Sequence, residues 1–157
     1  MYKTIIRMMV RQNVARLNAG DAGPMLTMAS RNVELRFPGD NSWARMFRPV
    51  EKSRRPYATH NGIDECRAFA DRFAAEGIQF TLEDIMVNGG PWNTRVAMRL
   101  VSHKPGANGV DEYNNRAMAV LEIRWGRLVV WEDYEDTERV AAWDRLHNRT
   151  EESVVNG

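Results

Sequence analysis

The chain has 157 residues, of which 43% are hydrophobic, and its 22 basic and 21 acidic residues leave a net charge of +1. This length predicts one domain with a core, and the balanced charge argues against nucleic-acid or membrane-surface partners. The apolar runs are too short to span a bilayer, charges at Lys3, Arg7 and Arg11 are unlike a secretory signal, and the single Cys66 allows no internal disulfide. We therefore expect a cytoplasmic protein.

The first part of the chain predicts a helical hairpin followed by a strand. Residues 18–21 (NAGD) supply a helix stop and a cap for a short second helix from Met25 to Ala29. Residues 32–37 (NVELRF) alternate as a strand does, and residues 40–59 are expected to form a long loop able to cover a cavity mouth. The first helix is predicted from apolar residues at helical spacing: Ile6, Val10, Val14 and Leu17.

The second part predicts one more helix and four strands. Strands are expected at 78–87, 92–101, 113–123 and 127–134, with a tight turn at Trp125-Gly126. Helices followed by hairpin-linked strands indicate an α+β domain, in which three N-terminal helices pack on one face of a curved antiparallel sheet. We expect one domain over residues 1–147 and a polar tail over 148–157. The third helix, which ends at Gly77, is predicted from an apolar stripe: Ile63, Cys66, Phe69, Ala70 and Phe73.

Asp133 stands at the end of the last predicted strand and shares a face with Val129 and Trp131. A carboxylate in this position either meets solvent at the sheet edge or lines a pocket, where burial and neighbours would change its pKa. Since charged residues are mostly exposed, the position alone favours the sheet edge.

Five segments carry a family resemblance: LNAGD (17–21), NVELRFPG (32–39), NGIDECRAF (61–69), NTRVAMRL (93–100) and WEDYED (131–136). Together they resemble the nuclear transport factor 2-like superfamily, and within it the SnoaL-like and limonene epoxide hydrolase-like proteins. WEDYED is the most specific, since it is similar to the W-R-D-Y-F-D ending of these relatives. The resemblance covers roughly residues 10–140 and implies a cone-shaped sheet around a mainly apolar cavity that binds a hydrophobic small molecule.

The resemblance also implies particular catalytic residues. In the epoxide hydrolase an aspartate in that ending activates water and an arginine on the neighbouring strand holds it, which implies Asp133 and Arg95 here. The proton-donating aspartate of that enzyme falls on Ala97, and the base and tyrosine of ketosteroid isomerase fall on Phe37 and Asn13. Both of those mechanisms therefore lack a group. Polyketide cyclases of the SnoaL type use one aspartate as acid or base, and this chain meets that pattern.

Arg95 decides how the predicted site would work. Periodicity alone lets Arg95 face water while Val96 and Met98 face the core, whereas the resemblance turns the Arg95 face into the cavity. There it would pair with Asp133 and keep this carboxylate ionised and oriented. His60 is alternatively an exposed or capping residue, and Asn115 a satisfied sheet amide. The predicted substrate-binding residues are Asn13, Trp43, Phe47, His60, Phe73, Asn93, Asn115 and Trp131.

The remaining patterns concern cofactors and partners. No phosphate-binding glycine loop, dinucleotide fingerprint or metal-ligand spacing is present, so we expect no cofactor and no metal. Cys66 is interpreted as a core residue, and the basic segment 45–55 as a solvated loop or, alternatively, a contact for an anionic substituent. If the Arg95 face lines the cavity, the other sheet face needs cover, which predicts a homodimer through the outer sheet face.

The sequence thus predicts an enzyme of hydrolase, isomerase or cyclase type that uses Asp133 as general acid or base on a hydrophobic small molecule. The alternative is a noncatalytic ligand-binding or dimerisation module of the same fold, because such folds serve both purposes. An enzyme would lose turnover and keep ligand affinity in Asp133→Asn, whereas a binding module would have no turnover to lose.

Overall fold

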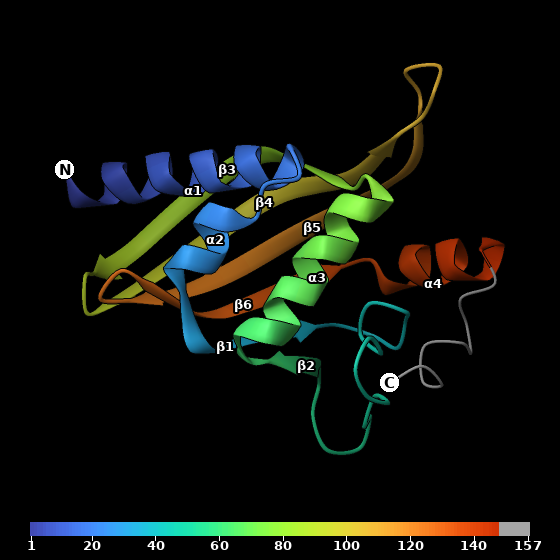
Figure 1. Cartoon of the computed structure of the whole chain (residues 1–157), viewed down its shortest axis with the longest axis horizontal. Coiled ribbons are helices and arrows are strands. Elements are labelled where there is room, and N and C mark those ends of the chain that lie inside the picture. The colour runs from blue at the N-terminus through green and yellow to red at the C-terminus, as the bar shows by residue number, and fades with distance from the viewer. Residues whose placement is uncertain (148–157) are drawn as a thin grey trace.

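Six strands form one curved sheet, and three helices from the first half of the chain lie across one of its faces (Figure 1). The computed structural model describes residues 1–147, and the predicted polar tail over 148–157 lies outside these residues. The strand order is β2-β1-β6-β5-β4-β3. In chain order the elements are α1 (Tyr2–Asn18), α2 (Gly23–Met28), β1 (Ala29–Phe37), β2 (Ala58–Asn61), α3 (Gly62–Glu76), β3 (Gln79–Gly90), β4 (Asn93–Pro105), β5 (Asp111–Arg124), β6 (Arg127–Glu135) and α4 (Thr137–Leu146).

The two long N-terminal helices follow from their apolar stripes. The buried residues of α1 are the four predicted ones, and those of α3 lie on the predicted stripe, Cys66 included. Asn18 ends α1 and fixes it to the sheet, because its side chain both donates to and accepts from the Phe80 backbone at 2.8 Å. Gly77 ends α3 with a φ of 69°, a left-handed conformation that favours glycine. The predicted helix stops are therefore confirmed.

The hairpin of β5 and β6 is also confirmed. Trp125 and Gly126 have φ angles of 50° and 76°, as the two central residues of a type I′ turn require. The antiparallel register sets Asp133 opposite Ala119, and Ala119 opposite Met98 of β4. This register decides which side chains share the helix-covered face, because neighbouring residues in a strand point to opposite faces.

Three features differ from the prediction, which was an antiparallel sheet with no helix after its last strand. Strand β1 pairs with β6 in parallel, so the sheet is mixed. Strand β2 lies inside the segment expected to be loop and pairs with β1, burying Ala58 and His60. Helix α4 follows β6, and Asp136 caps it by accepting hydrogen bonds from the backbone of Glu138 and Arg139. A capped helix of this length is stabilised by packing, here of the buried Val140.

The core lies between the helices and the inner sheet face. In β4 the even-numbered residues Val96, Met98 and Leu100 are buried, while Arg95 and Arg99 are exposed on the outer face. The periodicity-based alternative for this strand is therefore the one that the structure adopts. None of the helices within residues 1–147 is long and apolar enough to cross a membrane.

Candidate active site

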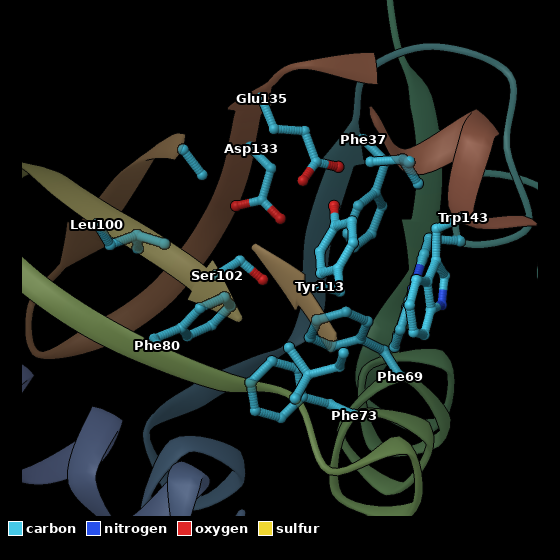
Figure 2. A pocket seen from close by; sticks show the side chains of 14 residues that line it. Phe37, Phe69, Phe73, Phe80, Leu100, Ser102, Tyr113, Asp133, Glu135 and Trp143 are labelled. Atoms are coloured by element: carbon cyan, nitrogen blue, oxygen red, sulfur yellow. The ribbon is translucent and has the colours of Figure 1, made fainter. Parts of the chain in front are cut away.

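A cavity opens between α3, α4, the segment before β2 and the inner ends of β4, β5 and β6 (Figure 2). Its volume is about 50 Å³, counted as space for the centres of water-sized spheres. About 10–15 Å³ of such space holds one water, so this volume takes a few waters or a small ligand group. The lining residues are Phe37, Trp43, Phe69, Phe73, Ile78, Phe80, Leu100, Ser102, Tyr113, Ala117, Asp133, Glu135, Val140 and Trp143.

Aromatic rings from five elements and a loop make most of the wall. Phe69 and Phe73 lie one turn apart on α3, and their neighbours are Phe37 of β1 and Phe80 of β3, at ring-centroid distances of 5.3 and 4.7 Å. Trp43 meets the edge of Phe69 at 5.7 Å. Rings at these distances and tilts stabilise one another beyond their burial, so the wall is held in place from several sides.

Two carboxyl groups face this wall from β6. Asp133 and Glu135 are two residues apart, which places both on the inner face, and Figure 2 shows their side chains next to each other at one side of the cavity. Trp131 Nε1 donates a 2.6 Å hydrogen bond to Asp133 Oδ1. The carboxyl group of Glu135 forms no hydrogen bond or ion pair with any residue between 1 and 147.

Burial changes the acidity of both groups. It raises the pKa of Asp133 to about 7, against the lowering effect of the Trp131 hydrogen bond. It raises the pKa of Glu135 to about 8, and the negative charges of Asp133 and Asp136 add to this. Burial also raises the pKa of Tyr113 to about 12. The two carboxyl groups therefore exchange protons near neutral pH, where acid–base catalysis is most efficient.

Two hydroxyl groups accompany the acids. Ser102 of β4 and Tyr113 of β5 line the same cavity, and in Figure 2 the Tyr113 hydroxyl points toward the carboxyl side. Asn115, which is buried, orients Tyr113 by donating from Nδ2 to its hydroxyl at 3.0 Å and to the Asp136 carbonyl at 2.9 Å. Asn115, predicted as a substrate contact, therefore reaches the site through Tyr113 and does not line the cavity itself.

The predicted pair of Arg95 with Asp133 is wrong. Asp133 shares its face with Ala119 and Met98, so the β4 side chains on that face are even-numbered. Arg95 lies on the opposite face, where its side chain is 55% exposed and its Nη2 is 3.4 Å from Glu122 Oε1. A carry-over displaced by one residue moves a side chain through the sheet, which is the physical reason for the error. Ala97 lies on the outer face for the same reason.

Of the predicted substrate contacts, Trp43 and Phe73 line the cavity together with Asp133. Trp131 lies beside it, buried, and reaches it through the hydrogen bond to Asp133. Asn13 lies elsewhere, in a smaller cavity between α1, α2 and the sheet that Trp131 also lines. The predicted direct contact of Asn13 with the same site is therefore not formed.

Phe47, His60 and Asn93 also lie outside the cavity. His60 is 1% exposed, bonds the Trp43 carbonyl through Nε2 at 2.9 Å and contacts Phe47 edge-on at 4.8 Å, so neither reading of it as an exposed or a cavity-mouth residue holds. Burial lowers the pKa of His60. Asn93 begins β4, at the opposite end of that strand from Ser102. These three residues were predicted as substrate contacts, and chain order does not give the depth of a side chain.

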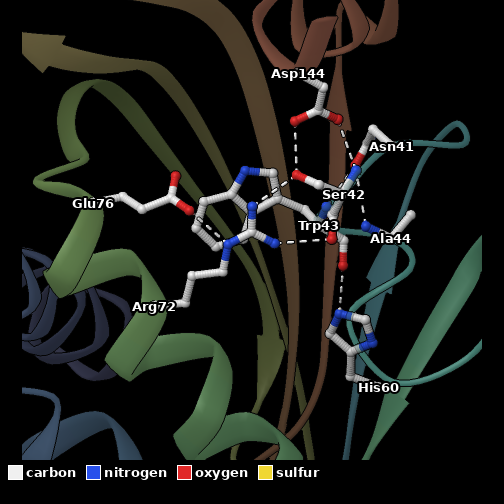
Figure 3. Close-up of polar contacts among 8 residues, drawn as sticks. All are labelled: Asn41, Ser42, Trp43, Ala44, His60, Arg72, Glu76 and Asp144. Atoms are coloured by element: carbon white, nitrogen blue, oxygen red, sulfur yellow. Dashed lines mark hydrogen bonds and ion pairs between the residues drawn. The ribbon is translucent and has the colours of Figure 1, made fainter. Parts of the chain in front are cut away.

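A buried polar cluster fixes the segment that carries Trp43 (Figure 3). Asp144 of α4 accepts from the backbone nitrogen and the hydroxyl of Ser42, both at 2.7 Å. Arg72 of α3 donates to the Ser42 carbonyl at 2.8 Å, binds Glu76, and lies 3.9 Å above the Trp43 ring. The cluster therefore holds α3, α4 and this segment together at the edge of the cavity.

Glu135 was not predicted as a site residue, although the sequence contains the signal: Glu135 follows Asp133 by two residues in a strand. Ser102 and Tyr113 could have been found in the same way, by extending the alternation of their strands. Val140 and Trp143 depend on α4, which was not predicted. The Ser42–Asp144 contact joins residues 102 positions apart and has no local signal.

Comparison with known proteins agrees with this architecture. The model of the SnoaL-like domain family matches residues 10–131. The chain therefore belongs to the SnoaL-like family, as its motifs predict. Comparison with proteins of curated function gives no match.

Similar solved structures share the fold at low sequence identity. A loop-truncation variant of IdmH is 17% identical over 87% of this chain and 96% of its own, with a TM-score of 0.64. An NTF2-like protein from Burkholderia pseudomallei is 20% identical over 89% of this chain and 95% of its own, with a TM-score of 0.62. A candidate polyketide cyclase from Xanthomonas campestris is 16% identical over 90% of this chain and 98% of its own, with a TM-score of 0.58. The predicted α+β fold of the NTF2-like type is thereby confirmed.

Proposed function

We propose that this SnoaL-like protein is an enzyme that transfers protons on a hydrophobic small molecule, with Asp133 and Glu135 as its acid–base pair. The observation that carries the proposal is the pair itself: two carboxyl groups without a basic partner, at one side of an aromatic cavity, with pKa values of about 7 and 8. Pairs of acids whose environments separate their pKa values are typical of acid–base catalysis.

The surroundings assign a role to each acid. The indole N–H of Trp131 stabilises the ionised form of Asp133 and orients it, which suits a base that takes a proton from water or from an acidic carbon. Glu135 keeps its proton to higher pH and suits an acid that protonates a substrate oxygen. Glu135 thus supplies the proton donor that the sequence reading lacked at Ala97. Tyr113, held by Asn115, is a further hydrogen-bond donor.

The substrate is proposed to be mainly apolar, because the wall contacting it is aromatic. Hydrolase, isomerase and cyclase reactions all use such an acid–base pair. The structural neighbour from Xanthomonas, a candidate polyketide cyclase, makes aromatic polyketides one class to test. We propose a cytoplasmic location and one domain over residues 1–147 as part of the same hypothesis.

We also propose a homodimer through the outer sheet face. The outer face carries Arg95. The sequence-based prediction had instead placed Val96 and Met98 on the outer face. Met86 and Tyr134 are 46% and 54% exposed there, and Val120 and Val130 lie between them on the same face. Exposed apolar side chains on a sheet are typical of a symmetric interface. Sedimentation should give twice the chain mass, and Val120→Asp should give the monomer; a monomeric wild type would contradict this.

The test of the catalytic proposal is a screen of epoxides, steroids and polyketide-like aromatics by thermal shift, followed by product analysis of each compound that binds. Asp133→Asn should reduce turnover by about 10²–10⁴-fold and leave affinity within a few-fold. Asp71→Asn is the matched control, since this acid is exposed on α3 and does not line the cavity. Binding without any product in the wild type would favour the noncatalytic ligand-binding or dimerisation module instead.

A further inference from the structure

The charge of the cavity is one-sided. No arginine, lysine or histidine is among the residues that line it, and its ionisable groups are Asp133, Glu135 and Tyr113. Asp133 and Glu135 are half-buried, and an ionised carboxyl group that loses part of its hydration is stabilised by a partner of opposite charge. Within residues 1–147 the chain provides no such partner for Glu135, whose carboxyl group Figure 2 shows directed into the cavity.

The cations nearest to the wall are bound elsewhere. Arg72 lies on the Trp43 ring, but its guanidinium is paired with Glu76 and donates to Ser42. Lys104 lies 5.8 Å from the Trp143 ring and 3.6 Å from a carboxylate oxygen of Glu112. Neither is a lining residue, so neither compensates the two acids.

The aromatic wall favours the same sign of charge. The face of an aromatic ring carries negative potential, and cations within about 6 Å of a ring centre are attracted to it. Rings from Phe69, Phe73 and Phe80 lie across the cavity from the carboxyl side. An anionic ligand would meet two acids and these ring faces with no counterion. A cation would meet compatible groups on both sides.

From these contacts we infer that the cavity selects an organic amine in its protonated form, with the ammonium group against Glu135 and Asp133 and the hydrocarbon part against the aromatic rings. This inference rests on the proposed function, since it names the substrate class of the same cavity. The ammonium N–H groups donate to the carboxylates, which supplies both the missing charge and the missing hydrogen bonds of Glu135.

Binding of such an amine has a signature that binding of a neutral molecule lacks. At pH 7 Glu135 carries its proton, because burial raises its pKa to about 8. An ammonium ion that pairs with Glu135 keeps its own proton and displaces that of the carboxyl group into solvent. About one proton is then released for each ligand bound, whereas a neutral ligand that accepts a hydrogen bond from the acid releases none.

Three probes of one shape and different charge test the inference: phenethylamine, 2-phenylethanol and phenylacetate. Their affinities for the full chain are measured by calorimetry at pH 7, in two buffers of different ionisation heat so that proton release is counted. We expect the amine to bind about tenfold or more tightly than the alcohol, and phenylacetate the most weakly. Proton release should accompany the amine alone.

Glu135→Gln should remove the preference for the amine and leave the alcohol bound as before, which also shows that the cavity is intact. Glu51→Gln is the matched control, because it removes one exposed acid that lies outside both the cavity and the sheet, paired with Arg54. Equal binding of amine and alcohol in the wild type, or a preference that persists in Glu135→Gln, overturns the inference. Neither result contradicts the proposed function, because the protein could still transfer protons on a neutral substrate. The proposed function fails only if no compound of the screen is converted.

Discussion

Two regions of this protein bury carboxyl groups, and they treat them in opposite ways. Asp144 is 1% exposed, accepts two hydrogen bonds from Ser42, and has Arg72 bound to the same serine. Asp133 receives one hydrogen bond from Trp131, and Glu135 receives none from residues 1–147. The carboxylate of the first region has hydrogen-bond partners within the protein, whereas the carboxyl groups of the second can still accept hydrogen bonds from a ligand.

The difference separates a structural acid from a functional one. A carboxylate with all its partners present stabilises the fold, and removing it leaves those partners unsatisfied. A pair of acids without partners costs stability, and such a cost is typical of sites that bind or react.

Asp144→Ala should lower the free energy of unfolding by about 3 kcal/mol, because Ser42 loses both of its bonds to the carboxylate and Arg72 loses a neighbouring charge. Urea denaturation measures the loss, and hydrogen exchange at the Ser42 amide should become faster. Arg145→Ala, an exposed change on the same helix, should stay within about 0.5 kcal/mol. An unchanged stability in Asp144→Ala would remove the distinction between the two regions.

Glu135→Gln should increase stability at high pH, by about 2 kcal/mol at pH 9. A pKa difference of nearly four units corresponds to about 5 kcal/mol for a fully buried acid, and solvent screening reduces this for the half-buried Glu135. An unfolded glutamate titrates near 4.3, whereas the pKa of Glu135 in the folded chain is about 8. Between these values the folded chain holds a proton that the unfolded chain has lost, so the wild type loses stability as pH rises, and glutamine does not. The two proteins should agree within about 0.5 kcal/mol near pH 4, measured by denaturation at each pH. A wild type that is more stable than the variant at pH 9 would refute this.

Trp131→Phe should raise the pKa of Asp133 by about one unit, because it removes the hydrogen bond that favours the ionised form. Carboxyl-carbon NMR measures this directly, and the acidic limb of any pH–rate profile should move with it. Trp125→Phe, in the exposed β5–β6 turn, should leave the titration where it is. A pKa that falls or stays the same in Trp131→Phe would show that the indole does not support the carboxylate.

Arg95→Gln should have the smallest effect: within about twofold on binding and turnover, and within about 0.5 kcal/mol on stability. Its ion pair with Glu122 lies on the outer face and is largely exposed. The measurement is a repeat of the assays used for Asp133→Asn. A loss of more than about tenfold would mean that Arg95 acts on the cavity after all.

The sequence predicted most of the fold, because its helices and long strands have strong local periodicity. The stripe of α1 and the turn at Trp125-Gly126 are examples. It failed for β2, which has four residues and is held by its pairing with β1, and for α4. In both cases tertiary contacts, not local pattern, decide the structure.

The candidate site was predicted less completely. Asp133 and Phe73 line the cavity, as a strand position and a helix stripe predict, because these patterns give the direction of a side chain; Trp43 lines it from the segment between β1 and β2. Arg95 was placed on the wrong face, since a resemblance carried over with a one-residue displacement reverses the direction in a strand. His60 was predicted as a substrate contact or, alternatively, an exposed or capping residue. It is buried outside the cavity, because its depth depends on Phe37 and Phe47 from other parts of the chain.

The bond between Ser42 and Asp144 has a consequence for how the protein is made. Its two residues are 102 positions apart, so the segment carrying Trp43 gains this contact only after α4 has been made. On the ribosome the sheet and the first three helices are synthesised earlier, and the wall formed by Trp43 and Trp143 is complete only when α4 emerges. Until then the aromatic surface is exposed, which makes the late steps of synthesis the stage at which a chaperone would have most to protect.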